Sequence, residues 1–477
     1  MKVITNAFWL SFSRIAADIL SFVLFAVISR TFGPAGSGQY SYAFAIATLV
    51  ALASTAGFED YGIRQYSGAA PHERPGLWRG LLTTQAVQLL IGATALGVFL
   101  LSNKMPAGGW IVVLELSIYV VGWTASYTFF IPALASQSMV SPAITDLACR
   151  LSAILIALML ALFAHTSLTW MLAGFPLAGV VLACLALRSA TTHGAVLRLG
   201  AWRGVVATWR QTSAFAGSEV LNQFYARADI LLIAYFLGDA KVGLYATDIK
   251  FVEVGILPLV LLGTAAYPLL SARGPGDRGP LSQAGRDFMR IVFFCSGWLA
   301  VSIYTLIPLL IVPIFGPKFA PSAALLPWFA LFALLKGWEV AFYRLLYAVH
   351  RQSYYFGSLV VGTVLIVLLN WELIPTHGIL GAIVAAIICI AGVDLICAVG
   401  LLRQLRPEFL VSVTARLAAA MGLTAAILAL AQRMAGTGQW SSAIIACTLF
   451  PVLGILCGLL PHPKRSPLLR HTGVENS

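Results

Sequence analysis

The most informative stretch of this chain is Gly33-Pro-Ala-Gly-Ser-Gly38-Gln-Tyr40. Its spacing of glycines and tyrosine recurs 205 residues later in Gly238-Asp-Ala-Lys-Val-Gly243-Leu-Tyr245. In each copy a long apolar segment ends at a glycine, and Gly-x-Tyr opens a second apolar segment. Glycine is the default residue where a backbone turns sharply. Internal duplication is a recurring architecture of secondary transporters, whose substrate site lies between the repeats. The repeat therefore predicts a duplicated membrane carrier.

The composition indicates a membrane protein. Of the 477 residues 60% are hydrophobic and only 10% are charged, against about 25% charged in a soluble domain. Apolar runs such as 151–164 and 356–369 belong to stretches of about 20 residues, which cross about 30 Å of hydrocarbon as a helix. Polar and apolar residues do not alternate along them, which argues against an outer-membrane barrel. We expect an all-α polytopic membrane protein with about 14 transmembrane helices.

The repeat divides these helices into two pseudo-symmetric six-helix lobes plus two C-terminal helices. Residues 1–190 are predicted to form the N-lobe (helices 1–6) and residues 211–405 the C-lobe (helices 7–12), with a basic cytoplasmic linker at 191–210. Residues 406–477 would hold helices 13 and 14 and a cytoplasmic tail. Twelve spans are the alternative, because either number puts both termini on one side of the membrane.

The charge distribution predicts the topology. Basic residues gather in alternate loops, for example at Arg198, Arg203 and Arg210, and such a bias marks the cytoplasmic side. We therefore expect a multi-pass protein of the cell inner membrane with cytoplasmic N- and C-termini. Arg14 and Asp18 interrupt the first apolar run, so this run is expected to remain as the first span and not to be cleaved. The net charge of +12 thus reflects topology, and no soluble basic domain offers a nucleic-acid site.

No cofactor or metal is expected. The 7 cysteines lie within apolar segments, without the spacing of metal ligands or of a disulfide framework. No Walker loop is present, so direct use of ATP is not expected. Transport would draw on an H+ or Na+ gradient or on the concentration of the substrate itself.

Ionisable residues inside the predicted spans are the candidate functional residues, because each costs about 2.5–3.5 kcal/mol at the centre of an isolated helix. Arg14 and Asp18 lie on one face of the first span. The offset of 205 maps them onto Glu219 and Gln223 of the seventh span. Equivalent helices thus carry polar stripes at equivalent depths, which predicts a hydrated cavity between the lobes. The candidate coupling carboxylates are Asp18, Glu219, Asp248 and Glu339.

Neutralisation within single helices is the alternative explanation for these charges. Asp146 and Arg150 are four residues apart, and Lys250 and Glu253 are three apart, which is salt-bridge spacing on a helix. For the set as a whole a cavity is favoured, since ion pairs facing lipid are a costly way to build a bundle. Asp394 has no evident partner in its own helix.

A family resemblance follows from the first 65 residues. Ser13-Arg-Ile15, Ile28-Ser-Arg-Thr-Phe-Gly-Pro34 and Gly38-Gln-Tyr-Ser41, followed by Gly57-Phe58 and Arg64, resemble the bacterial polysaccharide-transport flippases. These Wzx-like oligosaccharide flippases belong to the multidrug/oligosaccharidyl-lipid/polysaccharide exporter superfamily. The motifs are structural turns, specific for the superfamily but not for one substrate.

The resemblance implies that the protein moves an undecaprenyl-diphosphate-linked glycan across the inner membrane by alternating access. The glycan and diphosphate would travel through the cavity while the lipid tail stays among the membrane lipids. A polysaccharide polymerase and assembly proteins would be its partners. Arginine suits phosphate because its planar fork binds two oxygens at once, and tyrosine rings suit sugars. The candidate substrate contacts are Arg14, Arg150, Arg227, Lys250, Lys336 and Tyr343.

Other functions remain open on the sequence. Within the superfamily the alternatives are a lipid II flippase and a multidrug exporter driven by sodium or protons; the basic residues in the spans speak against the latter. From other classes, a membrane polysaccharide polymerase or glycosyltransferase would need a sizeable extracytoplasmic loop for catalysis, and a structural scaffold would not need buried charges. The sequence therefore predicts a transporter and not an enzyme.

Overall fold

The computed structural model describes residues 2–55, 58–102, 109–136, 138, 140–163, 167–196, 198–200, 202–271, 282–402, 404–405, 407–435 and 438–461. Helices are the only regular secondary structure in these ranges. The chain forms two compact units, Met1–Gly243 and Leu244–Ser477. This division follows packing, whereas the predicted lobes 1–190 and 211–405 follow the repeat, so the lobe boundaries stay a prediction.

Unit 1 contains eight helices and the start of a ninth among its described residues. They are α1 (Lys2–Thr55), α2 (Phe58–Gly68), α3 (Arg74–Ser102), α4 (Gly109–Ala135), α5 (Val140–Phe163), α6 (Leu168–Leu172), α7 (Gly174–Thr192), α8 (Trp202–Leu237) and the first turn of α9 (Asp239–Leu270).

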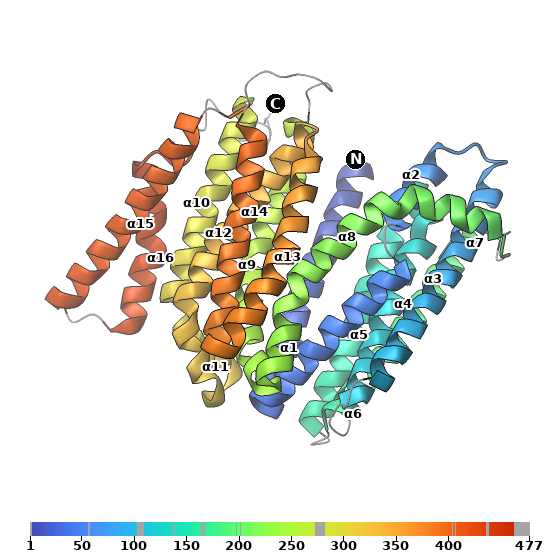
Figure 1. The fold of residues 1–477 in the computed structure, drawn as a ribbon, viewed down its shortest axis with the longest axis horizontal. Coiled ribbons are helices and arrows are strands. Elements are labelled where there is room, and N and C mark those ends of the chain that lie inside the picture. The colour runs from blue at the N-terminus through green and yellow to red at the C-terminus, as the bar shows by residue number, and fades with distance from the viewer. Residues whose placement is uncertain are drawn as a thin grey trace. The chain divides into compact units, whose positions relative to one another are not determined.

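The two glycine turns of the repeat join long helices, as predicted. Gly33 interrupts α1 with φ 70° and ψ −167°, so α1 consists of two arms, and Figure 1 shows the bend between them. Gly238 separates α8 from α9 with φ 79°. Side chains with a Cβ rarely adopt this left-handed region, which is why both positions need glycine. Pro34 follows the first turn, where its fixed φ starts the second arm and its missing N–H costs no helical hydrogen bond.

The two turns also touch each other, and the contact is reciprocal. A Cβ added to Gly38 would lie 1.7 Å from the carbonyl oxygen of Asp239, and one added to Gly243 would lie 2.0 Å from the carbonyl oxygen of Pro34. The offset of 205 that relates the glycines also relates Pro34 to Asp239. Small residues let two helix backbones approach this closely. The repeat therefore meets itself at a pseudo-symmetric crossing of α1 and the start of α9.

Close backbone packing also fixes the helices that carry the polar residues of unit 1. A Cβ on Gly122 of α4 would lie 2.5 Å from the carbonyl oxygen of Gly179 on α7. The edge of the Tyr119 ring packs on the Phe175 ring, 5.0 Å between centroids. The first half of α8 packs on α2 and α3, and Figure 1 shows this long bent helix passing over their ends. This half begins inside the predicted linker 191–210.

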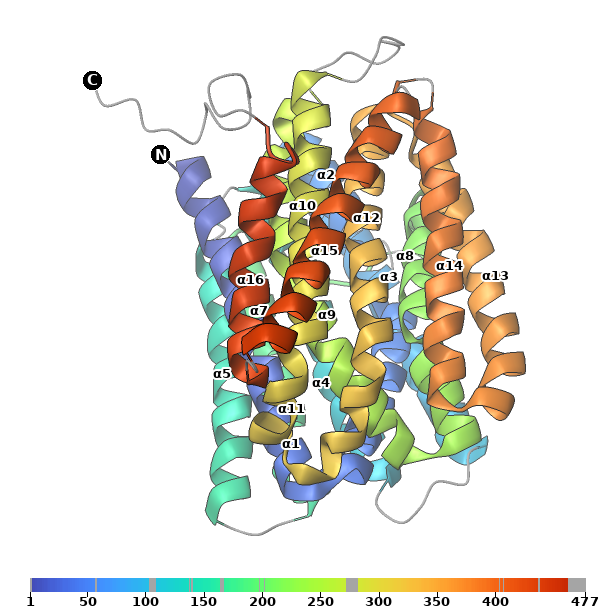
Figure 2. The same ribbon diagram turned by 90° about the vertical axis from the view of Figure 1, so that its left-hand side faces the viewer.

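Unit 2 is built around α12, which packs on helices to either side. Its elements are the rest of α9, α10 (Gln283–Thr305), α11 (Ile307–Phe315), the 3₁₀ helix η1 (Pro317–Leu325), α12 (Leu326–Ala348), α13 (Gln352–His377), α14 (Ile379–Leu401), α15 (Pro407–Ala435) and α16 (Gln439–Leu456). Helix α12 packs on α10 and α14, and α14 packs on α13. The last two helices lie against α10 (Figure 2), where the rings of Phe294 and Phe450 stack at 5.7 Å.

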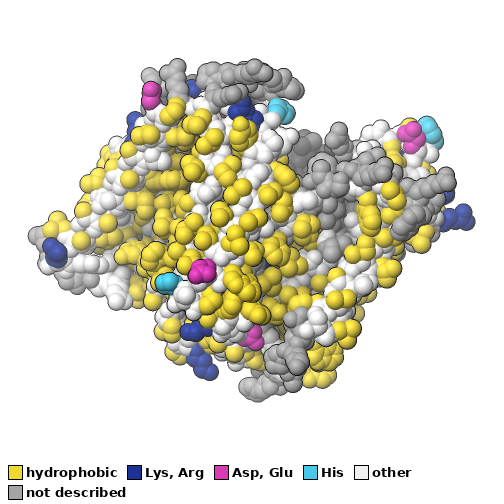
Figure 3. Space-filling view, viewed as in Figure 1, with side chains coloured by type: hydrophobic (Ala, Val, Ile, Leu, Met, Phe, Trp, Pro, Cys, Tyr) yellow, Lys and Arg dark blue, Asp and Glu magenta, His cyan; other side chains and the backbone are white. Residues whose placement is uncertain are grey.

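The helices have the length and surface of a multi-pass membrane protein. Thirteen helical segments among the described residues are long and apolar enough to cross a membrane. One of them, Ile15–Leu52, comprises both arms of α1. Counting these arms separately agrees with the expected fold of about 14 spans. Hydrophobic side chains cover most of the face seen in Figure 3, and the few charged ones gather mainly toward the ends of the helices. The all-α polytopic fold is thus confirmed.

Candidate functional site

The predicted site residues whose side chains are described fall into separate polar clusters, and each cluster lies within one unit. Arg14 and Glu219 are on α1 and α8, but their side chains lie outside the described set. The cavity that these residues were expected to share between the lobes stays a prediction.

In unit 1 the main cluster forms around Arg150. Its Nε donates to both carboxylate oxygens of Asp146, at 3.1 Å each, one turn earlier on α5. The guanidinium carbon lies 4.1 Å from the centre of the Trp123 ring on α4, which is cation–π geometry. Trp123 in turn contacts the edge of Tyr127 at 5.8 Å. The result is a partly buried, charge-neutral pair framed by aromatic rings.

This cluster has spare binding capacity. A guanidinium carries five N–H donors, and the hydrogen bonds to Asp146 use Nε. Its side chain keeps 13% of its surface exposed, against 14% for Asp146. The outer amino groups of Arg150 therefore suit a further oxyanion, and the flanking rings suit a flat or ring-shaped group beside it.

Two other predicted residues of unit 1 lie on neighbouring helices. Arg227 of α8 is half-buried, and its guanidinium carbon lies 5.7 Å from the centre of the Phe44 ring on the second arm of α1. Asp18 is exposed on the first arm of α1. Arg227 is thus held by an aromatic ring, as Arg150 is.

In unit 2 the corresponding cluster forms around Glu339, which is only 3% exposed. The ammonium group of Lys336 forms an ion pair with its Oε2 across one turn of α12. The hydroxyl of Tyr355 on α13 donates to Oε1 at 3.3 Å. Tyr343 lies beside this hydroxyl-bearing ring, 5.4 Å between centroids, and Tyr347 lies 6.1 Å from it. Three tyrosines therefore gather beside a buried carboxylate and its partly exposed lysine.

Arg344, which was not among the predicted contacts, belongs to the edge of this cluster. Its guanidinium carbon lies 5.0 Å from the centre of the Tyr343 ring. Its Nη2 donates to the hydroxyl of Thr264 on α9 at 2.8 Å. The sequence could have pointed to Arg344, because this residue directly follows the predicted contact Tyr343.

Asp394 stood out in the sequence as a charge with no partner in its own helix, but it was not among the predicted site residues. It is 5% exposed on α14, and neither of its carboxylate oxygens has a hydrogen-bond partner among the described residues. It lies within electrostatic reach of Glu339 and Lys336 on the packed helix α12. Three residues further along α14, the thiol of Cys397 contacts the Ser358 hydroxyl at 3.4 Å. Two buried carboxylates therefore share one lysine.

The polar residues of α9 point in different directions. Asp248 is fully buried and lies beside Ser322 of η1. Lys250 pairs with Glu253 at 2.6 Å, and the Glu253 side chain is 41% exposed. Lys250 and Glu253 therefore neutralise each other within one helix, as the alternative explanation of the charges predicted. Asp248, in contrast, is a buried acid.

No group of three or more His, Cys, Asp or Glu that could hold a metal ion occurs among the described residues. The described clusters offer oxyanion contacts at Arg150, aromatic surfaces beside it, and carboxylates at Glu339 and Asp394.

Comparisons with known proteins identify a family. The model of the family described as "Polysaccharide biosynthesis protein" matches residues 3–272, more than half of the chain. Among curated proteins, none matches the sequence.

The fold resembles solved transporter structures over nearly the whole chain. One is "Lipid II flippase MurJ, inward closed conformation", with a TM-score of 0.75 at 11% identity, covering 94% of this chain and 97% of that one. Another is the MATE multidrug transporter DinF-BH, with a TM-score of 0.56 at 14% identity, covering 84% and 95%. A third is an inward-facing multidrug resistance MATE family transporter of the MOP superfamily. Its TM-score is 0.53 at 12% sequence identity, and the match covers 84% of this chain and 95% of that one. These relatives are flippases and transporters and not enzymes.

Proposed function

Because the chain belongs to the polysaccharide biosynthesis family and has the fold of flippases and transporters, we propose that it flips a lipid-linked oligosaccharide across the bacterial inner membrane. The cargo is an undecaprenyl-diphosphate-linked glycan, moved from the cytoplasmic to the periplasmic leaflet by alternating access. The family match over residues 3–272 is the observation that carries this proposal.

The cluster around Arg150 supplies the chemistry for such a cargo. A diphosphate presents paired anionic oxygens, and an arginine fork binds them in a bidentate manner. The Trp123 ring 4.1 Å from the guanidinium carbon keeps this cation in place and offers an apolar face to a sugar ring. Asp146 cancels the charge of Arg150 in the resting protein, so the site does not hold the diphosphate irreversibly.

Ion coupling is assigned to the acidic cluster of unit 2. Among the candidate carboxylates Asp18, Glu219, Asp248 and Glu339, the described side chain of Glu339 lies beside a second buried acid, Asp394. Two carboxylates with one lysine leave one negative charge when all are ionised. A proton or a sodium ion would neutralise it, which couples binding of the ion to the conformation of α12 and α14.

A gene deletion tests the proposed cargo. We expect lipid-linked glycan to accumulate on the cytoplasmic leaflet of the deletion strain, and a wild-type copy to restore export. Arg433→Gln serves as a control copy, because Arg433 is exposed on α15 and should export normally. A deletion strain in which the lipid-linked glycan reaches the periplasm at the wild-type rate would overturn the proposal.

Lipid II flipping is the second candidate function, favoured by the TM-score of 0.75 with the lipid II flippase. The two candidates differ in one readout. If this chain sustains growth of a strain depleted of its own lipid II flippase, the cargo is the peptidoglycan precursor. Failure there, with restored glycan export in the deletion strain, supports the oligosaccharide.

A further inference from the structure

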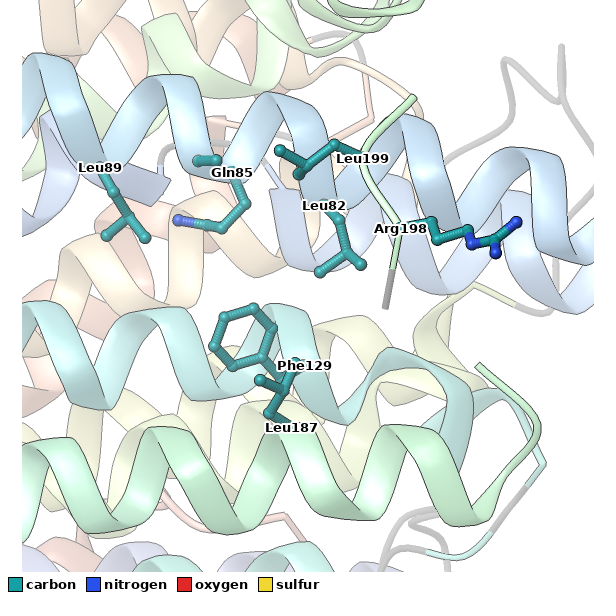
Figure 4. Close-up of a pocket in the computed structure, with 8 residues that line it drawn as sticks. Leu82, Gln85, Leu89, Phe129, Leu187, Arg198 and Leu199 are labelled. Atoms are coloured by element: carbon teal, nitrogen blue, oxygen red, sulfur yellow. The ribbon is translucent and has the colours of Figure 1, made fainter. Parts of the chain in front are cut away.

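An apolar groove lies on unit 1, and neither Asp146 nor Arg150 lines it. It has a volume of about 270 Å³ and runs along α3, with α4 and α7 opposite and residues 198–199 across one end. Figure 4 shows the side chains of Leu82 and Phe129 pointing toward each other across it. Other lining side chains are Leu89, Leu187 and Leu199.

The groove suits a hydrocarbon chain by shape. Leu82 and Leu89 lie seven residues apart on one face of α3, which makes the apolar floor about 10 Å long. A volume of 270 Å³ is below the range of about 300–1,000 Å³ for compact ligands. A partner helix, about 10 Å across, would not fit either. The side-chain amide of Gln85 donates to the Ser54 carbonyl and accepts from the Thr128 hydroxyl. It therefore does not need a polar group on the bound molecule.

The mouth of the groove is positively charged. Arg198 lines it, and in Figure 4 its guanidinium group points away from the leucines. Arg79 lies three residues before Leu82 on the same face of α3, and a Cβ on Gly200 would lie 3.4 Å from its Cβ. Arg188 is next to the lining residue Leu187 on α7, about 100° further round the helix, and does not itself line the groove. All three arginine side chains are exposed and take part in none of the ion pairs between described residues.

The segment that carries Arg198 is anchored on both sides. Before it, Ala195 is buried in a core cluster with Trp78. After it, the Gly200 amide donates to the Thr83 hydroxyl at 2.6 Å. Arg198 is therefore held at the mouth by two contacts that do not involve its own side chain.

We propose that this groove binds one anionic glycerophospholipid of the surrounding membrane, with an acyl chain along α3 and the phosphate against Arg79, Arg188 and Arg198. Charge complementarity selects the headgroup, since each basic residue near an anionic lipid surface contributes about 1 kcal/mol, or about five-fold in affinity. The apolar floor selects a chain and not a compact ligand. The proposal holds whichever cargo the protein carries.

Native mass spectrometry of the purified full-length protein tests it, with phosphatidylglycerol and phosphatidylcholine as probes. Wild-type protein should retain phosphatidylglycerol in preference to phosphatidylcholine. The variant Arg79→Gln/Arg198→Gln should bind phosphatidylglycerol about 25-fold more weakly, at five-fold per arginine. Arg433→Gln removes an exposed charge on α15 and should behave as wild type. Equal retention of both lipids by the wild type would overturn the proposal.

A second pair of variants tests the groove itself. Ala86 lines it and is exposed, so Ala86→Phe fills the groove without entering the core, and retention of both lipids should fall. Ala95 is exposed on the opposite face of α3, nine residues on, so Ala95→Phe should change neither. Thermal stability of each variant checks folding, and the smaller Ala86→Leu should give an intermediate loss. Unchanged retention by a folded Ala86→Phe, or displacement of phosphatidylglycerol by a polyprenyl phosphate at equal concentration, contradicts the proposal.

Discussion

The Arg150 cluster of unit 1 and the Glu339 cluster of unit 2 are built in the same way but differ in net charge. Each has an ion pair within one helix, Asp146–Arg150 or Lys336–Glu339, surrounded by aromatic rings. In unit 1 the charges cancel. In unit 2 the neighbouring helix α14 adds Asp394, whose carboxylate has no hydrogen-bond partner among the described residues. The first cluster therefore suits a transient anion, and the second suits a proton or a cation.

Removing the arginine of unit 1 should have the largest effect. Arg150→Ala is expected to lower glycan export by about 30-fold or more, because truncating one partner of a buried charge pair costs about 2–5 kcal/mol. It should also lower stability, since Asp146 is left without its counter-ion. Export of radiolabelled glycan and the melting temperature in detergent measure the two effects.

A double variant separates the two roles of Arg150. Asp146→Asn/Arg150→Gln removes both charges and should recover most of the stability while export stays low. Export restored together with stability would mean that Arg150 serves only to hold α5 in place.

The two acids of unit 2 should respond with opposite signs. Asp394→Asn removes a buried carboxylate that has no hydrogen-bond partner among the described residues, and should raise stability by about 1–3 kcal/mol. Glu339→Gln breaks the ion pair with Lys336 and should lower stability by a similar amount. Both variants should lose flipping driven by an imposed ion gradient in proteoliposomes. If Asp394→Asn destabilises the protein, the carboxylate has a partner and the proposed contrast between the units is wrong.

Removing the ring beside Arg150 should have a moderate effect. Trp123→Leu is expected to cost about 1–2 kcal/mol in stability, because the guanidinium loses its cation–π contact, and to weaken export less than Arg150→Ala does. Trp298→Leu is a matched control, since Trp298 contacts Cys447 of α16 outside both clusters. Export by Trp123→Leu below that of Arg150→Ala would contradict the ranking.

The smallest effect is expected at the edge of the Glu339 cluster. Tyr355→Phe removes one hydroxyl that donates to Glu339 at 3.3 Å, worth about 1 kcal/mol. A melting curve should show this loss. Flipping should remain ion-driven, because Lys336 still pairs with Glu339; an uncoupled Tyr355→Phe variant would make the tyrosine part of the ion site.

Much of the fold could be predicted because membrane helices are local features. The glycine turns at Gly33 and Gly238 and the apolar runs between them are visible in the sequence alone. The pairs Asp146–Arg150 and Lys250–Glu253 were also predictable, since both partners lie one turn apart on the same helix.

The rest of the site depends on contacts between helices, which spacing does not reveal. Asp394 meets Glu339 only because α14 packs on α12, more than fifty residues apart in the chain. The apolar groove likewise needs Leu82, Phe129, Leu187 and Arg198 from four different segments. Lys250 and Asp248, only two residues apart, differ in burial because neighbouring helical positions point to different sides.

The crossing of the two glycine turns has a consequence for how the halves of the chain can change over time. Each glycine leaves the gap that the main chain of the other copy fills, so enlarging either residue displaces its counterpart. A larger residue at Gly38 or Gly243 can be accommodated only if the facing main chain moves. Both positions should therefore remain glycine even where the rest of the two copies differs in sequence.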